Sequence, residues 1–273
     1  MPSYVITGVA RGIGYEFVRQ LSQDPRNTVI GVVRDKQQTI KKVSEDATLK
    51  GRSNIHILEA DLTSYEAVKR VAGEAAKITG GSVDYLIGNA GYISQFDAYE
   101  PIGVLGNEPQ KLEEELAKLI NIHVVANIHL INAFIPQILK GHAKKVIVLS
   151  SGFADLDLTN KFDLNLSSLY SISKAASNMA VAKFSAQYKT DGVLFLSITP
   201  GMVEVGHYVN STPEQLQKLG SGLGKFAEYA PNFTGPISPE EAVKLVRSVW
   251  EKASIENGSG GDFLSQFGNK QWL

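Results

Sequence analysis

The chain has 273 residues, a net charge of −1 and no cysteine. This length fits one large α/β domain or two small ones. The balanced charge gives no support for binding nucleic acid or an anionic membrane surface. The absence of cysteine excludes disulfides, cysteine-ligated zinc and thiol nucleophiles, and a reducing cytosol is the simplest expectation for localisation.

Two segments bear on targeting and membranes. The N-terminal residues begin an apolar, strand-like run almost at once, so we expect no signal peptide. Residues 122–139 carry no Lys, Arg, Asp or Glu, but they include Asn127, His129, Asn132 and Gln137, which would be costly in lipid. We therefore expect a helix buried in the protein or at a subunit interface of a homo-oligomer, and no membrane partner.

Short apolar runs alternate with longer segments of helical period along most of the chain. The runs are continuous, as in parallel strands covered on both faces, and are expected at 3–7, 28–33, 54–58, 83–88, 145–150 and 193–198. Helices are expected between them at 12–22, 36–47, 64–79, 111–139 and 167–189. This alternation predicts an α/β fold, with a single doubly wound, Rossmann-type parallel sheet and helices on both faces. One domain over residues 1–273 suffices.

The pattern loosens after the last of these runs. Residues 200–239 are rich in Gly, Pro, Ser and Thr, with at best a short helix near 213–219. We interpret about 202–236 as a substrate lid, the alternative being a mobile surface loop. A helix follows at 238–253, with Ser238 as N-cap and Pro239 at its first position, and residues 261–273 look like one more strand and a tail.

The first strand leads directly into a glycine-rich turn and then a helix. The turn reads Thr7-Gly8-Val9-Ala10-Arg11-Gly12-Ile13-Gly14. Glycines here let the backbone approach a pyrophosphate, which then lies at the positive end of the following helix. Glycine patterns also occur in tight turns without a ligand, but this position in an alternating α/β chain favours a dinucleotide.

The end of the second strand bears on the choice of cofactor. NAD sites usually place an acid about 20 residues after the glycines. Val33 stands there in this chain, followed by Arg34, and Arg11 lies in the glycine turn. Two cations near the adenosine ribose would suit the 2′-phosphate of NADPH. The alternatives are that both arginines are merely solvated, or that Asp35 serves as an NAD-type acid.

Two more motifs end predicted strands. Asp61-Leu62-Thr63 follows the third and Asn89-Ala90-Gly91 follows the fourth, at the carboxyl ends where open α/β sheets bind ligands. Asp61 is expected to accept a hydrogen bond from the adenine amino group. A compatible alternative makes Asp61 or Thr63 the N-cap of the next helix.

Tyr170 and Lys174 lie four residues apart in a predicted helix, so they share one face. A free tyrosine titrates near pH ~10. A neighbouring ammonium group favours the phenolate and lowers that pKa, which makes the phenol a usable acid–base group.

Together these motifs, in this order up to Pro200-Gly201, resemble those of the short-chain dehydrogenase/reductase family over nearly the whole chain. The resemblance implies that Ser151 polarises a substrate carbonyl, Tyr170 delivers the proton, and Lys174 holds the nicotinamide ribose. It also implies that Asn121 holds a water, although an ordinary hydrogen bond inside the helix is an alternative. The implied cofactor-binding residues are Thr7, Gly8, Arg11, Gly12, Ile13, Gly14, Arg34, Asp61, Leu62, Asn89, Ala90, Gly91, Tyr170, Lys174, Pro200, Gly201 and Val203.

Three features depart from the family pattern. Gly88 replaces the first of two asparagines before Ala-Gly, which should affect local rigidity. Tyr170 follows Ser151 by 19 residues, a longer spacing than usual, so residues 153–168 are expected to form a wall of the substrate pocket. Val205 stands where many relatives have a threonine that contacts the nicotinamide amide. Ser150 precedes Ser151, and the second serine of such a pair is usually the catalytic one.

The resulting prediction is an NADPH-dependent carbonyl reductase of the carbonyl-reductase-like branch, acting on a small-molecule ketone or aldehyde without a metal. Its pocket should be mostly apolar, with candidate lining residues Tyr92, Phe96, Phe153, Tyr208 and Phe226. Two alternatives remain: an alcohol dehydrogenase running in the reverse direction, and a catalytically idle regulator that senses NADPH.

Overall fold

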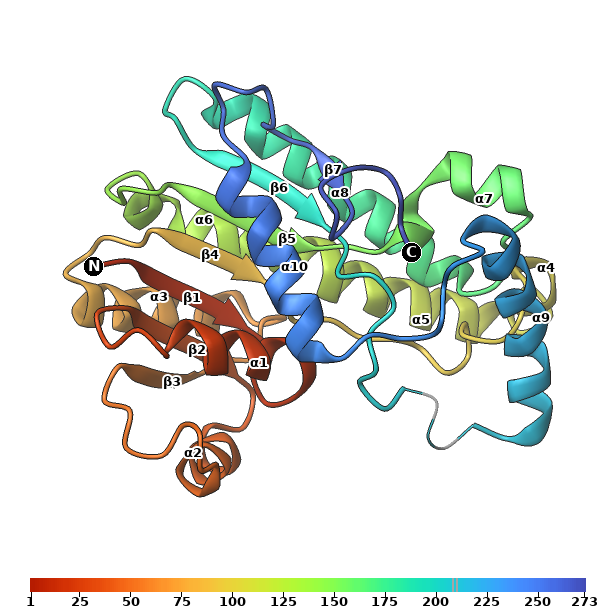
Figure 1. Ribbon diagram of the computed structural model, residues 1–273, viewed down its shortest axis with the longest axis horizontal. Helices are drawn as coiled ribbons and strands as arrows, with labels where there is room; N and C mark the ends of the chain where they lie inside the picture. Colours follow the sequence, from red (N-terminus) through yellow and green to blue (C-terminus); the bar gives the residue numbers. More distant parts are fainter. Residues whose placement is uncertain (208, 210) are drawn as a thin grey trace.

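The computed structural model describes residues 1–207, 209 and 211–273. Within these residues, seven parallel strands form one sheet (Figure 1). In sheet order they are β3 (Ile55–Glu59), β2 (Thr28–Val33), β1 (Ser3–Thr7), β4 (Tyr85–Gly88), β5 (Lys145–Leu149), β6 (Leu194–Ile198) and β7 (Phe263–Leu264). From β1 the chain adds β2 and β3 on one side, and it then returns to the centre and adds β4 to β7 on the other side. The predicted doubly wound parallel sheet is confirmed.

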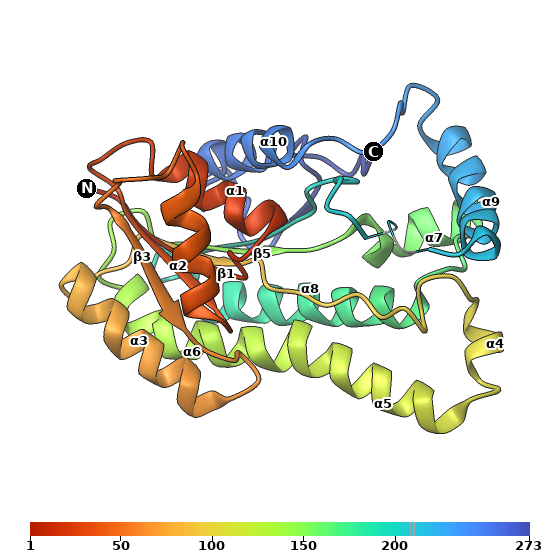
Figure 2. The ribbon, with the colours of Figure 1, turned by 90° about the horizontal axis from the view of Figure 1, so that it is seen from below.

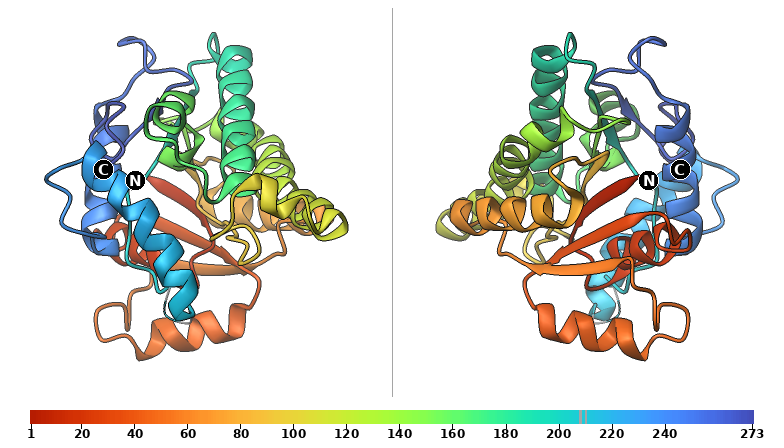
Figure 3. Two further views of the ribbon diagram at one scale, coloured as in Figure 1. Left: turned by 90° about the vertical axis from the view of Figure 1, so that its right-hand side faces the viewer. Right: turned by 90° about the vertical axis from the view of Figure 1, so that its left-hand side faces the viewer.

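Helices cover both faces of the sheet (Figures 2 and 3). In the described residues they are α1 (Gly12–Leu21), α2 (Lys36–Glu45), α3 (Tyr65–Thr79), α4 (Ile102–Leu105), α5 (Pro109–Ile120), α6 (Ala126–Ile138), α7 (Leu156–Phe162), α8 (Ser168–Tyr188), α9 (Pro213–Tyr229) and α10 (Pro239–Lys252). A π-helical turn η1 (Asn121–Val125) joins α5 to α6, and a 3₁₀ turn η2 (Gly152–Ala154) follows β5.

The side chains of each strand alternate between two apolar cores. Val5 and Ile30 belong to the core under α3, α6 and α8, whereas Ile6 and Val29 belong to the core under α1 and α10. All four side chains are fully buried. Each such side chain contributes roughly 1.5–3 kcal/mol by leaving water. Burial on both faces explains the continuous apolar runs in the sequence.

The predicted helix over 111–139 is wrong in one respect, because η1 interrupts it. Among the described residues, the segment Pro109–Ile138 alone is long and apolar enough to cross a membrane by length and composition. Leu130, Ile131 and Phe134 of this segment pack against the sheet in the first core. Such burial is typical of the core helix of a globular fold.

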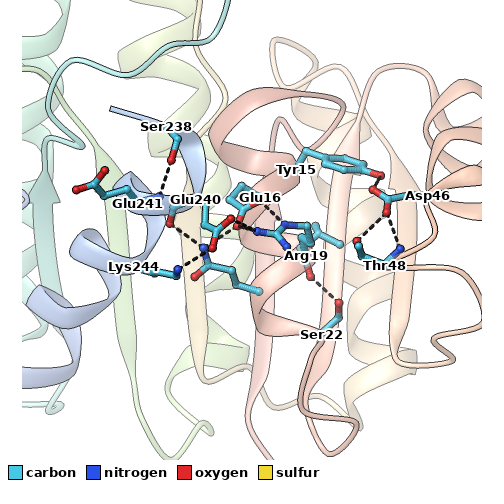
Figure 4. Close-up of polar contacts among 12 residues, drawn as sticks. Tyr15, Glu16, Arg19, Ser22, Asp46, Thr48, Ser238, Glu240, Glu241 and Lys244 are labelled. Carbon is cyan, nitrogen blue, oxygen red and sulfur yellow. Dashed lines mark hydrogen bonds and ion pairs between the residues drawn. The ribbon is translucent and has the colours of Figure 1, made fainter. Parts of the chain in front are cut away.

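A polar network fixes α1, whose N-terminus begins at the glycine turn (Figure 4). Arg19 pairs with Glu16 at 2.6 Å and with Glu240 of α10 at 3.0 Å. On the other side of α1, the Tyr15 hydroxyl donates to Asp46 at 2.8 Å, just beyond α2. Helix α1 is therefore attached to α10 through Arg19 and to the end of α2 through Tyr15.

The structure tests three local predictions. Ser238 caps α10 as expected, since its hydroxyl accepts the N–H of Glu241. Ser64, and neither Asp61 nor Thr63, caps α3, because its hydroxyl accepts the N–H of Ala67. The predicted short helix at 213–219 extends to Tyr229 as α9. Figures 1 and 2 place α4, α7 and α9 beyond the carboxyl ends of the strands.

Candidate active site

The glycine turn is bound to the end of β4 by a compact set of hydrogen bonds. Thr7 is fully buried, and its hydroxyl accepts the N–H groups of Asn89 at 3.1 Å and Ala90 at 3.0 Å. In return, the Asn89 amide donates to the carbonyl oxygens of Thr7 at 2.8 Å and Gly8 at 3.2 Å. These bonds join the carboxyl ends of β1 and β4, the edge of the sheet at which Asn89-Ala90-Gly91 is expected to lie.

Glycine is required in this turn by close backbone contacts. Gly8 has a φ of +75°, and a Cβ on it would lie 2.8 Å from Ala90 Cα. A Cβ on Gly14 would lie 2.3 Å from the Gly8 carbonyl oxygen. Arg11, the N-cap residue of α1, makes no side-chain capping bond. The leading N–H groups of α1 therefore have no side-chain acceptor from their N-cap, and an anionic diphosphate fits them.

The residues expected around the adenosine ribose lie as follows. β2 ends at the buried Val33, and Arg34 is exposed just beyond it. The Asp35 carboxylate accepts the N–H of Gln38 and so caps α2. Lys42 of α2 donates to the Ala10 carbonyl oxygen at 3.0 Å, which adds a cation that the sequence analysis did not select.

Asp61 stands at the carboxyl end of β3 with its carboxylate engaged locally. It accepts the N–H and the hydroxyl of Thr63 at 2.9 and 2.7 Å. These hydrogen bonds lower the pKa of Asp61, and the positive charge of Arg34 lowers it further. Asp61 is thus an anionic acceptor close to Arg34. The adjacent Leu62 packs against the apolar core.

The two serines after β5 differ in their contacts. Ser150 is buried and donates to the Asn178 side chain at 2.6 Å. Ser151 caps η2, accepting the N–H of Phe153 at 3.3 Å through its hydroxyl oxygen. The Ser150 hydroxyl proton is therefore directed to α8, whereas the Ser151 proton is not used by its capping bond.

Tyr170 and Lys174 lie on one face of α8, as their spacing predicts. The Lys174 ammonium lies 5.7 Å from the centroid of the Tyr170 ring and donates to the Leu149 carbonyl oxygen at 2.9 Å. Burial lowers the pKa of Lys174 to about 8. A cation at this position favours ionisation of a neighbouring phenol.

Asp97 supports Tyr170 from a distant part of the chain. Its buried carboxylate accepts the N–H groups of Leu169 and Tyr170, both at 2.8 Å. Ser167, the N-cap residue of α8, has a φ of +54° and makes no side-chain capping bond, so Asp97 takes over that role. This contact spans 73 residues, so no helical or strand period indicates it.

Asn121 is the first residue of the π turn η1. Its side chain is half-buried, and the Asn121 carbonyl accepts the N–H of Ala126. A π turn inserts an extra residue into a helix and often marks a functional site. The sequence placed Asn121 in the correct helix but did not predict this change in helical geometry.

A pocket of about 190 Å³ opens at this edge of the sheet. It brings Ser151 and Tyr170 together with Ile13 of the glycine turn and Pro200-Gly201 after β6. The full lining is Ile13, Ile93, Ser150, Ser151, Gly152, Phe153, Leu158, Tyr170, Thr199, Pro200, Gly201, Met202, Val203, Val205, His207, Trp272 and Leu273. Arg34 and Asp61 are not among these residues. They lie instead at the carboxyl ends of β2 and β3.

The expected pocket wall is only partly correct. Phe153 and Leu158 of the long insertion line the pocket, but Tyr92 and Phe96 do not. Those two rings pack between α5 and α8, under the ammonium groups of Lys118 and Lys111 respectively. Tyr208 and the Phe226 side chain lie outside what the structure describes.

Trp272 is a pocket residue that the sequence analysis missed. It stacks on Phe263 with ring centroids 4.4 Å apart, and a Cβ on Gly152 would lie 2.7 Å from its Cβ. The backbone N–H of Trp272 donates to the Tyr229 hydroxyl at the end of α9. The predicted tail at 261–273 thus lines the pocket through Trp272, and the same residue is hydrogen-bonded to α9 in the predicted lid.

The segment after Pro200-Gly201 runs beside the glycine turn. Val203 forms a parallel bridge with Ile237, in which Met202 and Glu204 supply the backbone bonds. Val203 therefore keeps its own N–H and C=O outside this ladder. A Cβ on Gly12 would lie 3.2 Å from Val205, which places the departure at Val205 directly against the turn.

The departure at Gly88 has a physical explanation. Asn127 of α6 fills the space beside it, and a Cβ on Gly88 would lie 2.6 Å from the Asn127 Oδ1. The Asn127 amide in turn donates to the His123 carbonyl at 2.8 Å. A side chain from α6 thus occupies the place of the missing strand side chain.

Within residues 1–207, 209 and 211–273, no cluster of three or more His, Asp or Glu side chains could hold a metal ion. The glycine turn fits a dinucleotide, and the pocket beside it holds a tyrosine with a buried lysine behind its ring. This combination defines a nicotinamide-dependent oxidoreductase built on a Rossmann-type sheet.

The comparisons with known proteins identify the family. A sequence model described as short chain dehydrogenase matches residues 3–216, so the chain belongs to the short-chain dehydrogenase/reductase family. It is 62% identical over 273 residues to the short chain dehydrogenase virK of Hypocrea virens, and 57% identical over 274 residues to the short-chain dehydrogenase/reductase iacC of Pestalotiopsis fici. Both alignments cover 100% of each chain.

Solved structures show the same fold at lower identity. The carbonyl reductase Sniffer of D. melanogaster superposes with a TM-score of 0.77 at 21% identity. An NADPH-bound carbonyl reductase from chicken fatty liver superposes with a TM-score of 0.73, also at 21% identity. Each comparison covers 98% of both chains.

Proposed function

We propose that this oxidoreductase is an NADPH-dependent carbonyl reductase acting on an apolar ketone or aldehyde. The observation that carries the proposal is the convergence of Ser151 and Tyr170 in one pocket, with the Lys174 ammonium behind the tyrosine ring. Retention of all three groups also speaks against a catalytically idle regulator.

Each residue has a definite task in this reaction. NADPH, when bound, supplies the hydride. The Ser151 hydroxyl donates a hydrogen bond to the carbonyl oxygen, and Tyr170 gives that oxygen its proton as negative charge develops. The buried Lys174 ammonium stabilises the resulting phenolate. Asn121, at the start of the π turn, is proposed to hold a water that returns a proton from solvent.

Three cations support the choice of NADPH. Arg34 follows β2, Arg11 is the N-cap residue of α1, and Lys42 donates to the carbonyl oxygen of Ala10, the residue before Arg11. The competing acid, Asp35, is engaged as the cap of α2. A 2′-phosphate near this group would find positive charge, whereas the ribose of NAD would find no free carboxylate at Val33.

The pocket lining supports an uncharged, mostly apolar substrate. Phe153, Leu158, Met202 and Trp272 form its walls. Apart from Tyr170, His207 is the ionisable side chain among the described lining residues, and burial, followed by the Arg11 charge, lowers its pKa.

Residues 202–236 are proposed to act as the lid of this pocket, in one catalytic domain. Cytoplasmic localisation and a homo-oligomer stay predictions.

The test is oxidation of NADPH and NADH by the purified protein over a panel of ketones, aldehydes, diketones and quinones. We expect NADPH turnover that Tyr170→Phe abolishes, while Tyr188→Phe at the far end of α8 keeps wild-type rates. Turnover unaffected by Tyr170→Phe would refute the mechanism. Binding of NADPH without turnover over the whole panel would favour the regulator.

Cofactor choice is tested separately with Arg34→Ala. We expect the Kd for NADPH to rise at least tenfold, as loss of a charged hydrogen bond of about 1.5–3 kcal/mol implies, while the Kd for NADH stays constant. Equal effects on both cofactors, or a wild-type preference for NADH, would overturn this assignment.

A further inference from the structure

His123 is a fully buried histidine in the π turn that the proposed reaction does not use. Its Nε2 accepts the N–H of Tyr92 at 3.1 Å, and its Nδ1 lies 2.8 Å from the Ser173 hydroxyl oxygen. The Ser173 hydroxyl donates to the Tyr170 carbonyl at 2.7 Å. These bonds form a continuous chain from the loop after β4 to the backbone of Tyr170.

The partners determine the tautomer of His123. A backbone N–H can only donate, so Nε2 must be the unprotonated nitrogen. The imidazole is neutral, because burial and then the Lys174 charge lower the pKa of His123 to about 2. Its proton therefore lies on Nδ1, which donates to Ser173. Ser173 can accept this bond while donating its single proton to Tyr170.

The ring also contacts Tyr170 directly. The His123 and Tyr170 ring centroids lie 5.5 Å apart at an interplanar angle of 86°, an edge-to-face arrangement. Such aromatic pairs contribute about 0.5–1.5 kcal/mol beyond the burial of their area. His123 therefore contacts the Tyr170 ring directly and holds the Tyr170 backbone through Ser173.

Resting on the proposed function, we propose that His123 is a positioning residue that fixes the Tyr170 phenol relative to Lys174. It connects three segments: the loop that continues from Asn89-Ala90-Gly91, the π turn that begins at Asn121, and the helix that carries Tyr170. The π turn brings His123 into this position between α5 and α6.

The test uses His123→Phe, which keeps an aromatic ring but removes both hydrogen bonds, and Ser173→Ala, which removes the link while keeping the histidine. His129→Phe is the matched control, since His129 lies on α6 and packs on Tyr65 away from the site. The readout is kcat for alcohol oxidation with NADP⁺ as a function of pH. Oxidation needs ionised Tyr170, so its rate rises with pH through the pKa of that phenol.

A displaced phenol lies farther from the Lys174 charge, and its pKa therefore rises. We expect both variants to move the midpoint of the rate profile to higher pH and to lower kcat by roughly 10- to 100-fold, as a misplacement of about 1 Å does. The Kd for NADPH should stay at the wild-type value. An unmoved midpoint in both variants would overturn the proposal, even if kcat falls.

A second readout does not depend on turnover. Nitrogen-15 NMR of histidine-labelled wild-type protein should show one side chain as the neutral Nδ1–H tautomer from pH 5 to 9, and this signal should vanish in His123→Phe. A His123 that titrates in this range would refute the hydrogen-bond chain. Failure to reduce any carbonyl would instead count against the proposed function, and would leave the tautomer result standing.

Discussion

Replacing Lys174 by methionine should make the cofactor-free protein more stable while abolishing its activity. The folded protein holds this ammonium in a fully buried position, and burial lowers its pKa from 10.5 to about 8. At ~1.4 kcal/mol per pH unit, this difference corresponds to a penalty of about 3 kcal/mol at pH 7. Loss of the bond to the Leu149 carbonyl offsets about 1 kcal/mol. The expected net gain in unfolding free energy is therefore about 2 kcal/mol.

The gain must depend on pH in a defined direction. Below pH 8 the folded protein carries the desolvated ammonium, so the full penalty is present. Between pH 8 and 10.5 the folded state loses this proton before the unfolded chain does, so the wild type becomes more stable relative to the variant. Above pH 10.5 only the lost hydrogen bond remains, and the variant should be the less stable protein by about 1 kcal/mol.

Urea unfolding at pH 7, 8, 9 and 10 measures this difference. Lys145→Met is the comparison variant, because Lys145 is a partly buried lysine that donates to the Trp250 and Ala253 carbonyls at the end of α10, at 2.6 and 2.9 Å. Burial lowers the pKa of Lys145 too, but the charges of Glu251 and Glu256 oppose this shift, whereas no such charge in the described part of the chain offsets the burial of Lys174. That variant should lose about 1–2 kcal/mol at pH 7. A Lys174→Met variant that is less stable than wild type at pH 7, or a gap independent of pH, would refute the reasoning.

Three glycines give further predictions. Gly14→Ala puts a Cβ 2.3 Å from the Gly8 carbonyl oxygen. We expect this variant to bind no NADPH in calorimetry and to lose about 1–3 kcal/mol of unfolding free energy. Wild-type affinity for NADPH would contradict this prediction. Gly73→Ala, in open space within α3, should raise the unfolding free energy in urea by up to ~1 kcal/mol, and a loss counts against it. Gly152→Ala places a Cβ against Trp272. It should raise KM for the carbonyl substrate in steady-state kinetics and leave the Kd for NADPH unchanged. A raised Kd for NADPH with an unchanged KM for the substrate would show that Trp272 does not shape the substrate pocket.

Periodicity predicted the sheet well because its strands are buried on both faces. The expected strands at 3–7 and 28–33 are observed without change, and those at 54–58, 83–88, 145–150 and 193–198 differ by one or two residues at their ends. β7 has only two residues, Phe263 and Leu264, and was expected only in outline. The motifs at Thr7, Asn89 and Tyr170 were found because their spacing along the chain is local.

Contacts between distant segments were not predictable in this way. Asp97 reaches Tyr170 over 73 residues, and His123 reaches Ser173 over 50. Neither contact follows from a helical or strand period. The π turn was missed for the same reason, since residues 121–125 continue the apolar pattern of the helices on either side. Trp272 was assigned only to a tail, because its contacts with Gly152 and Phe263 join separate elements and follow no period.

The close fit of Gly88 against Asn127 couples two positions that lie on different elements. Any side chain at position 88 would place its Cβ 2.6 Å from the Asn127 Oδ1, so the Asn127 side chain would have to move. Such a movement would disturb the bond that the Asn127 amide donates to the His123 carbonyl. The effect of a substitution at position 88 on stability therefore depends on which residue stands at position 127, so the two positions are expected to be epistatic.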